Sequence, residues 1–527
     1  MLSAEEKEKM MIVRVDTPGL QYDINAIVKA FYPDRDVRVL EPDLSVHDES
    51  VLSLPMFMEV RFPGDPVTDD PERKPDKTDG SDDIESAATG HICVADKQFE
   101  FRADPQIGAK NSFKLRLYDV MCEITGRTLP WGNLTGVRPT KIAMTRIKNG
   151  ESDDEILEFM RGYHRVSNPK SDLALDIAHR ELTLLDRLDH RNGYSLYIGI
   201  PFCPTTCLYC SFTSSPIGAW RDREDTYLEA LYAEIDYLAD ASCRGVFRSY
   251  PDTIYIGGGT PTSLDEEHLE KLLKYLCEKI DVGSALEFTC EAGRPDSITA
   301  GKLAIMKKYG VTRISINPQT MQQKTLDIIG RRATPSQVRD AFNLAREAGF
   351  DNINMDIILG LPGEGADEVS DTLRQISDMQ PDSLTVHSLA IKRASALKQH
   401  LDEIGIEALK NTDETMTLAA SAAGNMGMKP YYLYRQKNMS GNFENTGYAT
   451  PGKECLYNIL IMEEIQSIVA LGAGSISKRV DYPLNPESTD KSDIPVNISR
   501  AENLKDIESY IARIDEMIER KRELFEK

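Results

Sequence analysis

The sequence predicts an α/β fold, a partial (β/α)6 barrel of the TIM type, and two observations lead to this prediction. From Tyr194 onward, short apolar segments alternate with helical stretches such as Glu224–Ala239 and Ser336–Ala348. Strands that alternate with helices usually lie parallel in a wound sheet or barrel. The chemically unusual residues follow these strands directly, which is where such folds build their sites.

Six segments are predicted as strands, fewer than the eight of a complete barrel. Each has an apolar or β-branched character and precedes a loop rich in Gly, Pro or Cys. The predicted strands are Ser195–Ile200, Thr253–Ile256, Leu286–Cys290, Arg313–Ile316, Asn352–Leu359 and Ser383–His387.

Residues 1–190 are predicted to form an α+β module that precedes the barrel at 191–480. Alternating apolar stretches at Met11–Val15, Phe57–Phe62 and His91–Val94 predict strands. Residues 64–90 hold nine acidic and three basic residues and no aromatic one, so we expect a disordered loop there. Helical spacing over Glu155–Leu188 predicts a connector.

Residues 481–527 are predicted to be a short helical C-terminal segment. From about Val496 the charged and apolar residues follow the pattern of an amphipathic helix. We expect this segment to pack against or cap the rest of the chain, with no part in the chemistry.

Composition and charge exclude several classes of protein. Of the 527 residues, 41% are hydrophobic and 28% charged, which is typical of a globular chain. A membrane span and a secretory signal are not expected, because no run is apolar enough. The net charge of −23 disfavours general nucleic-acid binding. Nine cysteines are too few for a disulfide scaffold, so a cytoplasmic location is expected.

A cluster of cysteines follows the first predicted strand of the barrel. Cys203, Cys207 and Cys210 have the spacing C-x3-C-x2-C within Phe-Cys-Pro-Thr-Thr-Cys-Leu-Tyr-Cys. Three thiolates on one short loop can hold three irons of a [4Fe–4S] cluster and leave the fourth iron open. A zinc site would need a fourth ligand, and no His or Cys follows within the loop. The remaining alternative is three core cysteines that lie close by chance.

This motif resembles that of the radical S-adenosylmethionine (SAM) superfamily. The surrounding Tyr-Ile-Gly-Ile-Pro-Phe-Cys is similar to the oxygen-independent coproporphyrinogen III oxidase family. Cys203–Phe212 and the segment Trp131-Gly-Asn-Leu-Thr-Gly-Val-Arg-Pro139 resemble its HemZ branch. The resemblance implies a [4Fe–4S] cluster held by the three cysteines, together with one or two molecules of SAM.

The resemblance also implies SAM contacts after the second and third strands. In Ile256-Gly-Gly-Gly-Thr-Pro-Thr262, the residues Gly258, Gly259 and Thr260 match the loop that holds the methionine part of SAM. Glycines there allow a ligand to approach the backbone. Glu291 matches the glutamate that contacts SAM, and a carboxylate at a strand end can accept hydrogen bonds from an ammonium or ribose group. The alternatives are a tight turn and a solvated acid.

Later strands supply further residues that match cofactor contacts of the family. Gln319 and Arg331 are similar to residues that hold a second SAM or a nucleotide-like group, although Arg332 is an equally placed neighbour of Arg331. Asp356 is an acid within an apolar strand, which is costly unless it has a partner.

Four more positions match residues that line the cofactors in this family. Ala390 and Ile476 are expected to contribute backbone or apolar contacts. Tyr197 and Tyr209 flank the cysteines and match aromatic residues next to the cluster and SAM.

Three functions fit these features, and one of them is a radical SAM enzyme that acts on a different substrate. The resemblance implies an enzyme that oxidatively decarboxylates coproporphyrinogen III propionates to vinyl groups, giving protoporphyrinogen IX, with flavodoxin or ferredoxin as a reductant. However, Phe212 stands where oxidising members commonly carry a further cysteine, and Gly199 stands where a histidine is frequent. Phe212 and the short C-terminus favour the alternative, a haem chaperone with a cluster and no decarboxylase activity.

An anionic tetrapyrrole is expected as the bound molecule of the oxidase and of the chaperone alike. Because the chain is strongly acidic, local cations must meet the carboxylates of such a substrate. The candidates for this role are Lys392, Arg393, Arg435 and Lys437.

Overall fold

The computed structural model describes residues 10–41, 56–61, 89–94, 97–104, 107–212, 214–392, 395, 397, 405, 409–436, 439–482 and 497–527. The loop predicted at residues 64–90 lies outside this set up to residue 88, as do Arg393 and Lys437. The chain forms two compact units, one of residues 1–139 and 145–175 and one of residues 140–144 and 176–527. The predicted domain boundaries at residues 190 and 480 remain predictions.

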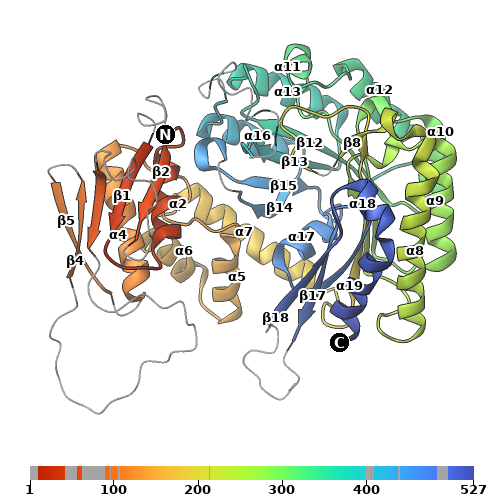
Figure 1. Ribbon diagram of the computed structural model, residues 1–527. Coiled ribbons are helices and arrows are strands. Elements are labelled where there is room, and N and C mark those ends of the chain that lie inside the picture. The colour runs from red at the N-terminus through yellow and green to blue at the C-terminus, as the bar shows by residue number, and fades with distance from the viewer. Residues whose placement is uncertain are drawn as a thin grey trace, which may run out of the picture. The chain divides into compact units, whose positions relative to one another are not determined.

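The first unit contains a mixed sheet with helices on one face (Figure 1). The strand order is β2-β1-β3-β4-β5, with β1 parallel to both neighbours and β3, β4 and β5 antiparallel. Helices α2 and α4 pack together, and their apolar side chains form one core with the sheet. The strands are β1 Met10–Val15, β2 Asp36–Leu40, β3 Met56–Arg61, β4 Thr89–Val94 and β5 Lys97–Arg102.

The helices up to residue 185 include those predicted in the connector. They are α2 Gln21–Phe31, α4 Gly108–Thr125, α5 Thr140–Lys148, α6 Asp153–Gly162 and α7 Asn168–Leu185. Helix α6 begins at a capping box, in which Ser152 accepts a hydrogen bond from the Glu155 amide and Glu155 bonds back to Ser152.

The second unit is built on one open sheet of eleven strands, in the order β14-β15-β13-β12-β11-β10-β9-β6-β16-β17-β18. Its strands are β6 Tyr194–Ile200, β9 Thr253–Gly258, β10 Glu287–Gly293, β11 Arg313–Ile316, β12 Ile353–Leu359, β13 Ser383–Ser388, β14 Lys429–Tyr434, β15 Asn445–Ala449, β16 Ser467–Leu471, β17 Ile476–Asp481 and β18 Asn497–Glu502. Two short parallel strands, β7 Phe202–Cys203 and β8 Ser215–Pro216, pair separately.

The six predicted barrel strands are confirmed as β6 and β9 to β13, all mutually parallel. Strand β16 adds a seventh parallel strand beside β6, while antiparallel strands form both edges. The fold is therefore a partial barrel that does not close.

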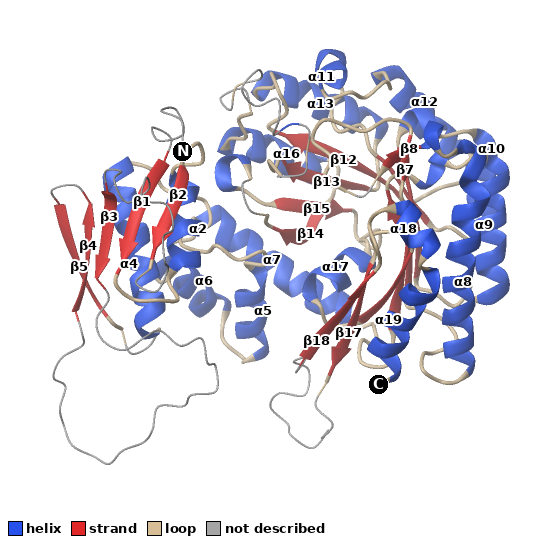
Figure 2. Ribbon diagram, viewed as in Figure 1, coloured by secondary structure: helices blue, strands red, loops and turns tan. Residues whose placement is uncertain are grey.

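Helices cover the outside of this sheet, as Figure 2 shows for the second unit. Many of them begin at side-chain caps, such as Asp265 at α9 and Thr334, followed by Pro335, at α12. The helices are α8 Glu224–Cys243, α9 Glu266–Lys279, α10 Ala300–Lys308, α11 Gln323–Ile328, α12 Pro335–Glu347, α13 Ala366–Met379, α16 Asp413–Asn425, α17 Leu456–Glu463, α18 Ile507–Ala512 and α19 Ile514–Glu526. Among the described helices, none combines the length and the apolar character needed to cross a membrane.

The helical C-terminal segment predicted from about Val496 requires a correction. Residues Asn497–Glu502 form strand β18, which pairs with β17 along its whole length, and helix begins only at Ile507. The spacing of apolar residues favours a helix here, but the backbone amides and carbonyls of β18 form hydrogen bonds with β17 instead. This tertiary pairing outweighs the local preference of the segment.

Helix α17 fills one end of the barrel interior. It contacts both β9 and β14, which lie far apart in the strand order, so the sheet curves around it. Glu287 at the start of β10 accepts hydrogen bonds from Cys455 Sγ at 3.1 Å and from the Leu456 amide at 2.6 Å. This carboxylate satisfies an otherwise unpaired amide at the N-terminus of α17. Helix α17 therefore occupies the end of the barrel at which strand β10 begins.

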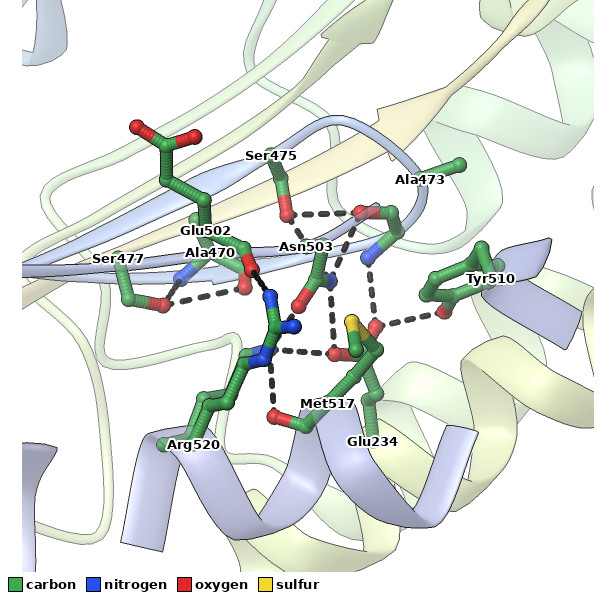
Figure 3. Close-up of polar contacts among 12 residues, drawn as sticks. Glu234, Ala470, Ala473, Ser475, Ser477, Glu502, Asn503, Tyr510, Met517 and Arg520 are labelled. Atoms are coloured by element: carbon green, nitrogen blue, oxygen red, sulfur yellow. Dashed lines mark hydrogen bonds and ion pairs between the residues drawn. The ribbon is translucent and has the colours of Figure 1, made fainter. Parts of the chain in front are cut away.

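A buried carboxylate joins the C-terminal elements to the sheet. Glu234 on α8 accepts hydrogen bonds from the Gly472 amide and the Tyr510 hydroxyl, both at 2.6 Å, and from Asn503 at 2.9 Å. Its fourth partner is Lys521 Nζ at 2.5 Å, and both charged side chains are almost fully buried. Figure 3 shows Asn503 and Tyr510 directed toward Glu234. This group, the Glu234 network, links α8, α18, α19 and the turn before β17.

Replacing Lys521 with methionine is expected to lower the free energy of unfolding by about 3–5 kcal/mol, because the variant leaves the carboxylate of Glu234 buried without its cation. Urea denaturation followed by circular dichroism measures this loss. The matched control is Lys527→Met, which removes an exposed pair with Glu523 and should change the free energy by less than about 0.5 kcal/mol. Equal losses in the two variants would contradict the role assigned to the buried pair.

Candidate active site

The three cysteines lie on the loop that follows β6, at the carboxyl end of the parallel strands. Cys203 ends β7, and its Sγ lies 3.5 Å from the hydroxyl of Thr260. The amide of Cys210 donates to the carbonyl of Cys207 at 3.1 Å, which folds the loop into a turn. Burial raises the pKa of the Cys203 thiol, and so do the neighbouring Cys210 and Cys207. The three cysteines therefore lie on one short loop, and Cys203 interacts electrostatically with the other two.

The glycine triplet after β9 packs directly on the backbone of the cysteine loop. The Gly259 amide donates to the Ile200 carbonyl at 2.7 Å, and the Thr260 amide donates to the Phe202 carbonyl at 2.6 Å. A Cβ atom on Gly259 would lie 2.5 Å from the Phe202 carbonyl oxygen. Gly258 has φ of +108°, which favours glycine. The packing of the protein itself therefore requires glycine here, whether or not a ligand also approaches.

Glu291 lies at the carboxyl end of β10 above a layer of tyrosines. The hydroxyl of Tyr255 donates to the Glu291 carboxylate. Tyr255 stacks on Tyr457 of α17, with ring centroids 4.6 Å apart, and Tyr197 stacks on both. Burial raises the pKa of the Glu291 carboxyl to about 7, with a further rise from Asp356 that the Tyr255 hydrogen bond opposes. Glu291 can therefore change protonation state near neutral pH.

Asp356 has the partners that an acid in an apolar strand needs. Asn354 Nδ2 donates to its Oδ1 at 2.6 Å, and His387 Nε2 lies 3.7 Å from its Oδ2. Burial alone would raise the pKa of Asp356, but His387 and Asn354 hold it below its ordinary value. Asp356 is therefore an ionised carboxylate within the barrel.

Gln319 and Arg331 have buried polar atoms without partners. Gln319 has a left-handed backbone (φ +68°), and its backbone amide donates to the backbone carbonyl of Asp356 at 2.9 Å. Within the part of the chain that the structure describes, Gln319 Oε1 and Arg331 Nε have no hydrogen-bond partner. Arg331 is buried and donates to the Asn317 carbonyl, whereas Arg332 is exposed. Buried polar atoms of this kind normally have partners, so the two atoms fit a polar ligand such as SAM.

The remaining predicted residues occupy different surroundings. Tyr209 is half-buried beside Arg331 and Cys207, and desolvation of its hydroxyl raises the pKa of that group. Ala390 follows β13 and forms a backbone bridge with Met439. Ile476 begins β17, is 40% exposed and pairs with Glu502. The contacts described for Ala390 and Ile476 are thus backbone pairings outside the group around the cysteines.

Two residues near the cysteines were absent from the sequence prediction. Arg294, three residues beyond Glu291, donates from Nη1 to Cys207 Sγ at 3.6 Å. Tyr255, two residues before the glycine triplet, bonds to Glu291. Alternation along β9 could have placed Tyr255 on the inner face with Gly257. The contact of Arg294 depends on a loop distant in sequence and left no local signal.

Comparison with known proteins gives the family of this chain. A family described as the radical SAM superfamily matches residues 197–376. The chain is 38% identical over 424 residues to the oxygen-independent coproporphyrinogen-III oxidase-like protein HemZ of Bacillus subtilis, covering 79% of this chain and 82% of the relative. The chain belongs to the radical SAM superfamily, in its HemZ/HemN-like group. It is also 39% identical over 202 residues to the heme chaperone HemW of B. subtilis, covering 38% of this chain and 51% of HemW.

A solved structure, that of coproporphyrinogen III oxidase (HemN) from Escherichia coli, aligns with 64% of this chain and 73% of HemN at 20% identity and a TM-score of 0.47. Radical SAM proteins use a [4Fe–4S] cluster and SAM, so the cofactors predicted from the sequence are confirmed. The residues of this radical SAM chain fit them, because three cysteines on one short loop provide a thiolate donor set, and Gln319 Oε1 and Arg331 Nε are buried polar atoms without a hydrogen-bond partner among the described residues. Binding of a second SAM stays a prediction.

Substitution of Gly259 by alanine is expected to destabilise the protein by about 1–3 kcal/mol, because the added methyl group overlaps the Phe202 backbone. The matched control is Gly218→Ala, where a Cβ meets nothing within 4 Å and the change should stay within about 0.5 kcal/mol. Thermal or urea denaturation of both variants measures the difference. A neutral Gly259→Ala variant would contradict the close backbone contact.

The raised pKa of Glu291 makes stability depend on pH. Its folded-state pKa of about 7 exceeds its ordinary value of 4.5, so the folded state binds more protons between these values. The contribution to stability is fully present below about pH 4.5 and is lost as the pH rises through about 7. Relative to Glu291→Gln, the free energy of unfolding of the metal-free chain should fall across this window by up to about 1.4 kcal/mol per pH unit.

Urea denaturation at a series of pH values tests this trend. Glu368→Gln is the control, because an amide hydrogen bond from Gly365 lowers the pKa of Glu368 and moves its titration below the window. A pH trend that survives in Glu291→Gln would assign the titration to another group.

Proposed function

We propose that this chain is a radical SAM enzyme that oxidatively decarboxylates the propionate side chains of coproporphyrinogen III without oxygen. The observation that carries the proposal is the group of cysteines, Gln319 and Arg331, with its unpartnered buried polar atoms, at the carboxyl ends of the parallel strands. The substrate is supported by the 38% identity to a relative named for coproporphyrinogen oxidation.

In this proposal Cys203, Cys207 and Cys210 hold the [4Fe–4S] cluster. The residues proposed for SAM are Gly258, Gly259, Thr260, Glu291, Gln319, Arg331 and Asp356, together with Tyr197, Tyr209, Ala390 and Ile476. When bound, the reduced cluster and SAM supply the one-electron chemistry that removes a hydrogen atom from an unactivated carbon. Each propionate then loses carbon dioxide and one electron to an acceptor, which leaves a vinyl group.

The side chains of the chain itself prepare the site. Asp356, ionised and held by His387, offers a carboxylate to ribose hydroxyls or an ammonium group. Glu291 can accept hydrogen bonds as a carboxylate or donate one when protonated. The stacked tyrosines Tyr197, Tyr255 and Tyr457 exclude water below these acids. Together these residues give a polar site bounded on one side by a layer of aromatic rings that excludes water.

The anionic substrate requires cations, and the structure separates the proposed ones. Lys392 lies next to Cys210, and its ammonium group is 5.2 Å from the ring centroid of Phe212. Burial lowers the pKa of Lys392. Arg435 is buried and donates to Asn442 Oδ1 at 2.6 Å, so it supports its own loop. We therefore propose Lys392 for a propionate, and a flavodoxin or ferredoxin as the reductant.

A second candidate function is a haem chaperone without decarboxylase activity. Phe212, two residues after the last cysteine of the motif, is 69% exposed. A large exposed apolar ring beside the proposed cluster can pack against the flat apolar face of a haem. Such a ring cannot supply the thiol that oxidising members commonly carry at this position. The local identity to HemW supports the same reading.

Product analysis after anaerobic cluster reconstitution distinguishes the two functions. With coproporphyrinogen III, SAM and a low-potential reductant, we expect protoporphyrinogen IX and 5′-deoxyadenosine, and Cys207→Ala should abolish both. Deoxyadenosine without a decarboxylated tetrapyrrole would show that the substrate is a different one. An intact cluster with neither product, together with tight haem binding, would establish the chaperone.

A further inference from the structure

Hydrogen bonds hold the guanidinium group of Arg294 in one orientation, in which it contacts Cys207. Arg294 lies just beyond β10 and is 2% exposed. A guanidinium group has five N–H donors in a rigid plane. Two of them bind the Asp296 carboxylate, from Nε at 3.0 Å and from Nη2 at 2.9 Å. This bidentate pair sets the plane of the group.

The other donors of Arg294 reach the cysteine loop. Nη1 donates to the Thr205 carbonyl at 3.3 Å and Nη2 donates to the Thr205 hydroxyl at 3.1 Å. The second hydrogen of Nη1 points to Cys207 Sγ at 3.6 Å. All five donors therefore have acceptors, and one of these acceptors is the sulfur atom of a proposed iron ligand.

The surroundings of the three cysteines are unequal. Cys207 accepts a hydrogen bond from Arg294 and also interacts with Arg331 and Tyr209. Cys203 contacts the neutral hydroxyl of Thr260 and interacts with Arg294 only electrostatically, and Cys210 has Lys392 nearby. Cys207 is thus the cysteine of the motif whose sulfur accepts directly from Arg294.

Hydrogen bonds to the sulfur ligands are one of the factors that set the reduction potential of an iron–sulfur cluster. Reduction adds one negative charge, which a buried cation stabilises more strongly in a low-dielectric site than at the surface. A hydrogen bond from a charged donor is also stronger than one from a neutral donor. Asp296 offsets part of the charge of Arg294 at longer range, but the N–H group of Arg294 points directly at Cys207 Sγ and therefore favours the reduced cluster.

We propose that Arg294 is a positioning residue that raises the reduction potential of the cluster through its hydrogen bond to Cys207, and so eases electron transfer from the physiological reductant. The proposal rests on the assignment of the three cysteines under the proposed function, but it holds for an oxidase and for a chaperone alike. It adds no bond and transfers no atom; Arg294 changes only the equilibrium of one-electron reduction.

The test is a redox titration of the reconstituted cluster followed by electron paramagnetic resonance, in the full-length parent chain and in Arg294→Gln. We expect the equilibrium constant for reduction to fall at least tenfold in the variant, which corresponds to about 59 mV for one electron. Arg374→Gln is the matched control, because it removes the same charge from an exposed position on α13. The control should leave the potential unchanged.

Each outcome decides the proposal. An unchanged potential in Arg294→Gln, or an equal fall in Arg374→Gln, overturns it. If Arg294→Gln assembles no cluster, Arg294→Lys decides, because lysine keeps the charge but not the fork to Asp296 and Thr205. A lower potential in Arg294→Lys supports the proposal, and an unchanged or higher one overturns it. A parent chain that assembles no cluster refutes the assignment of the cysteines, and the proposal falls with it.

Discussion

The close backbone contact between the ends of β6 and β9 is the constraint on which the site depends. Parallel pairing from Ser195 with Thr253 to Ile200 with Gly258 brings the glycine triplet onto residues 200–202. The cysteine loop leaves the sheet at this contact, with its first turn already hydrogen-bonded to the next strand. Main-chain atoms therefore position the start of the loop, and the side chain of Arg294 holds the part around Thr205 and Cys207.

The polar interior of the barrel is a second determinant of function. Helix α17 and its tyrosine neighbours block the end where the strands begin, and Glu287 anchors that helix. The inward positions of later strands carry Asn354, Asp356 and His387, which bind one another. Chemistry is thereby confined to the carboxyl ends of the strands, where the cysteines, Glu291 and Gln319 lie.

The sequence was informative where the signal is local. The six central strands and the cysteine motif could be predicted because apolar periodicity and ligand spacing are properties of short segments. Strand β18 was mistaken for helix, since its partner β17 is separated from it by residues 482–496. Helix α17, the contact of Arg294 with Cys207 and the left-handed backbone of Gln319 likewise depend on neighbours distant in the chain. The family resemblance identified the candidate site residues, and the structure identified the hydrogen-bond and ion-pair partners of Glu291 and Asp356.

The glycines also have a consequence for how such a protein can diverge. Gly259 faces the backbone of Phe202, and Gly472, held by the Glu234 network, faces the carbonyl of Gly199. At both positions the main chain itself excludes a side chain, so mutation cannot explore new chemistry on this side of the sheet. The inward positions of β12 and β13, by contrast, carry side chains such as Asn354, Asp356 and His387. Substitutions that reshape the inner face of the sheet are therefore sterically possible there and are excluded at these two glycines.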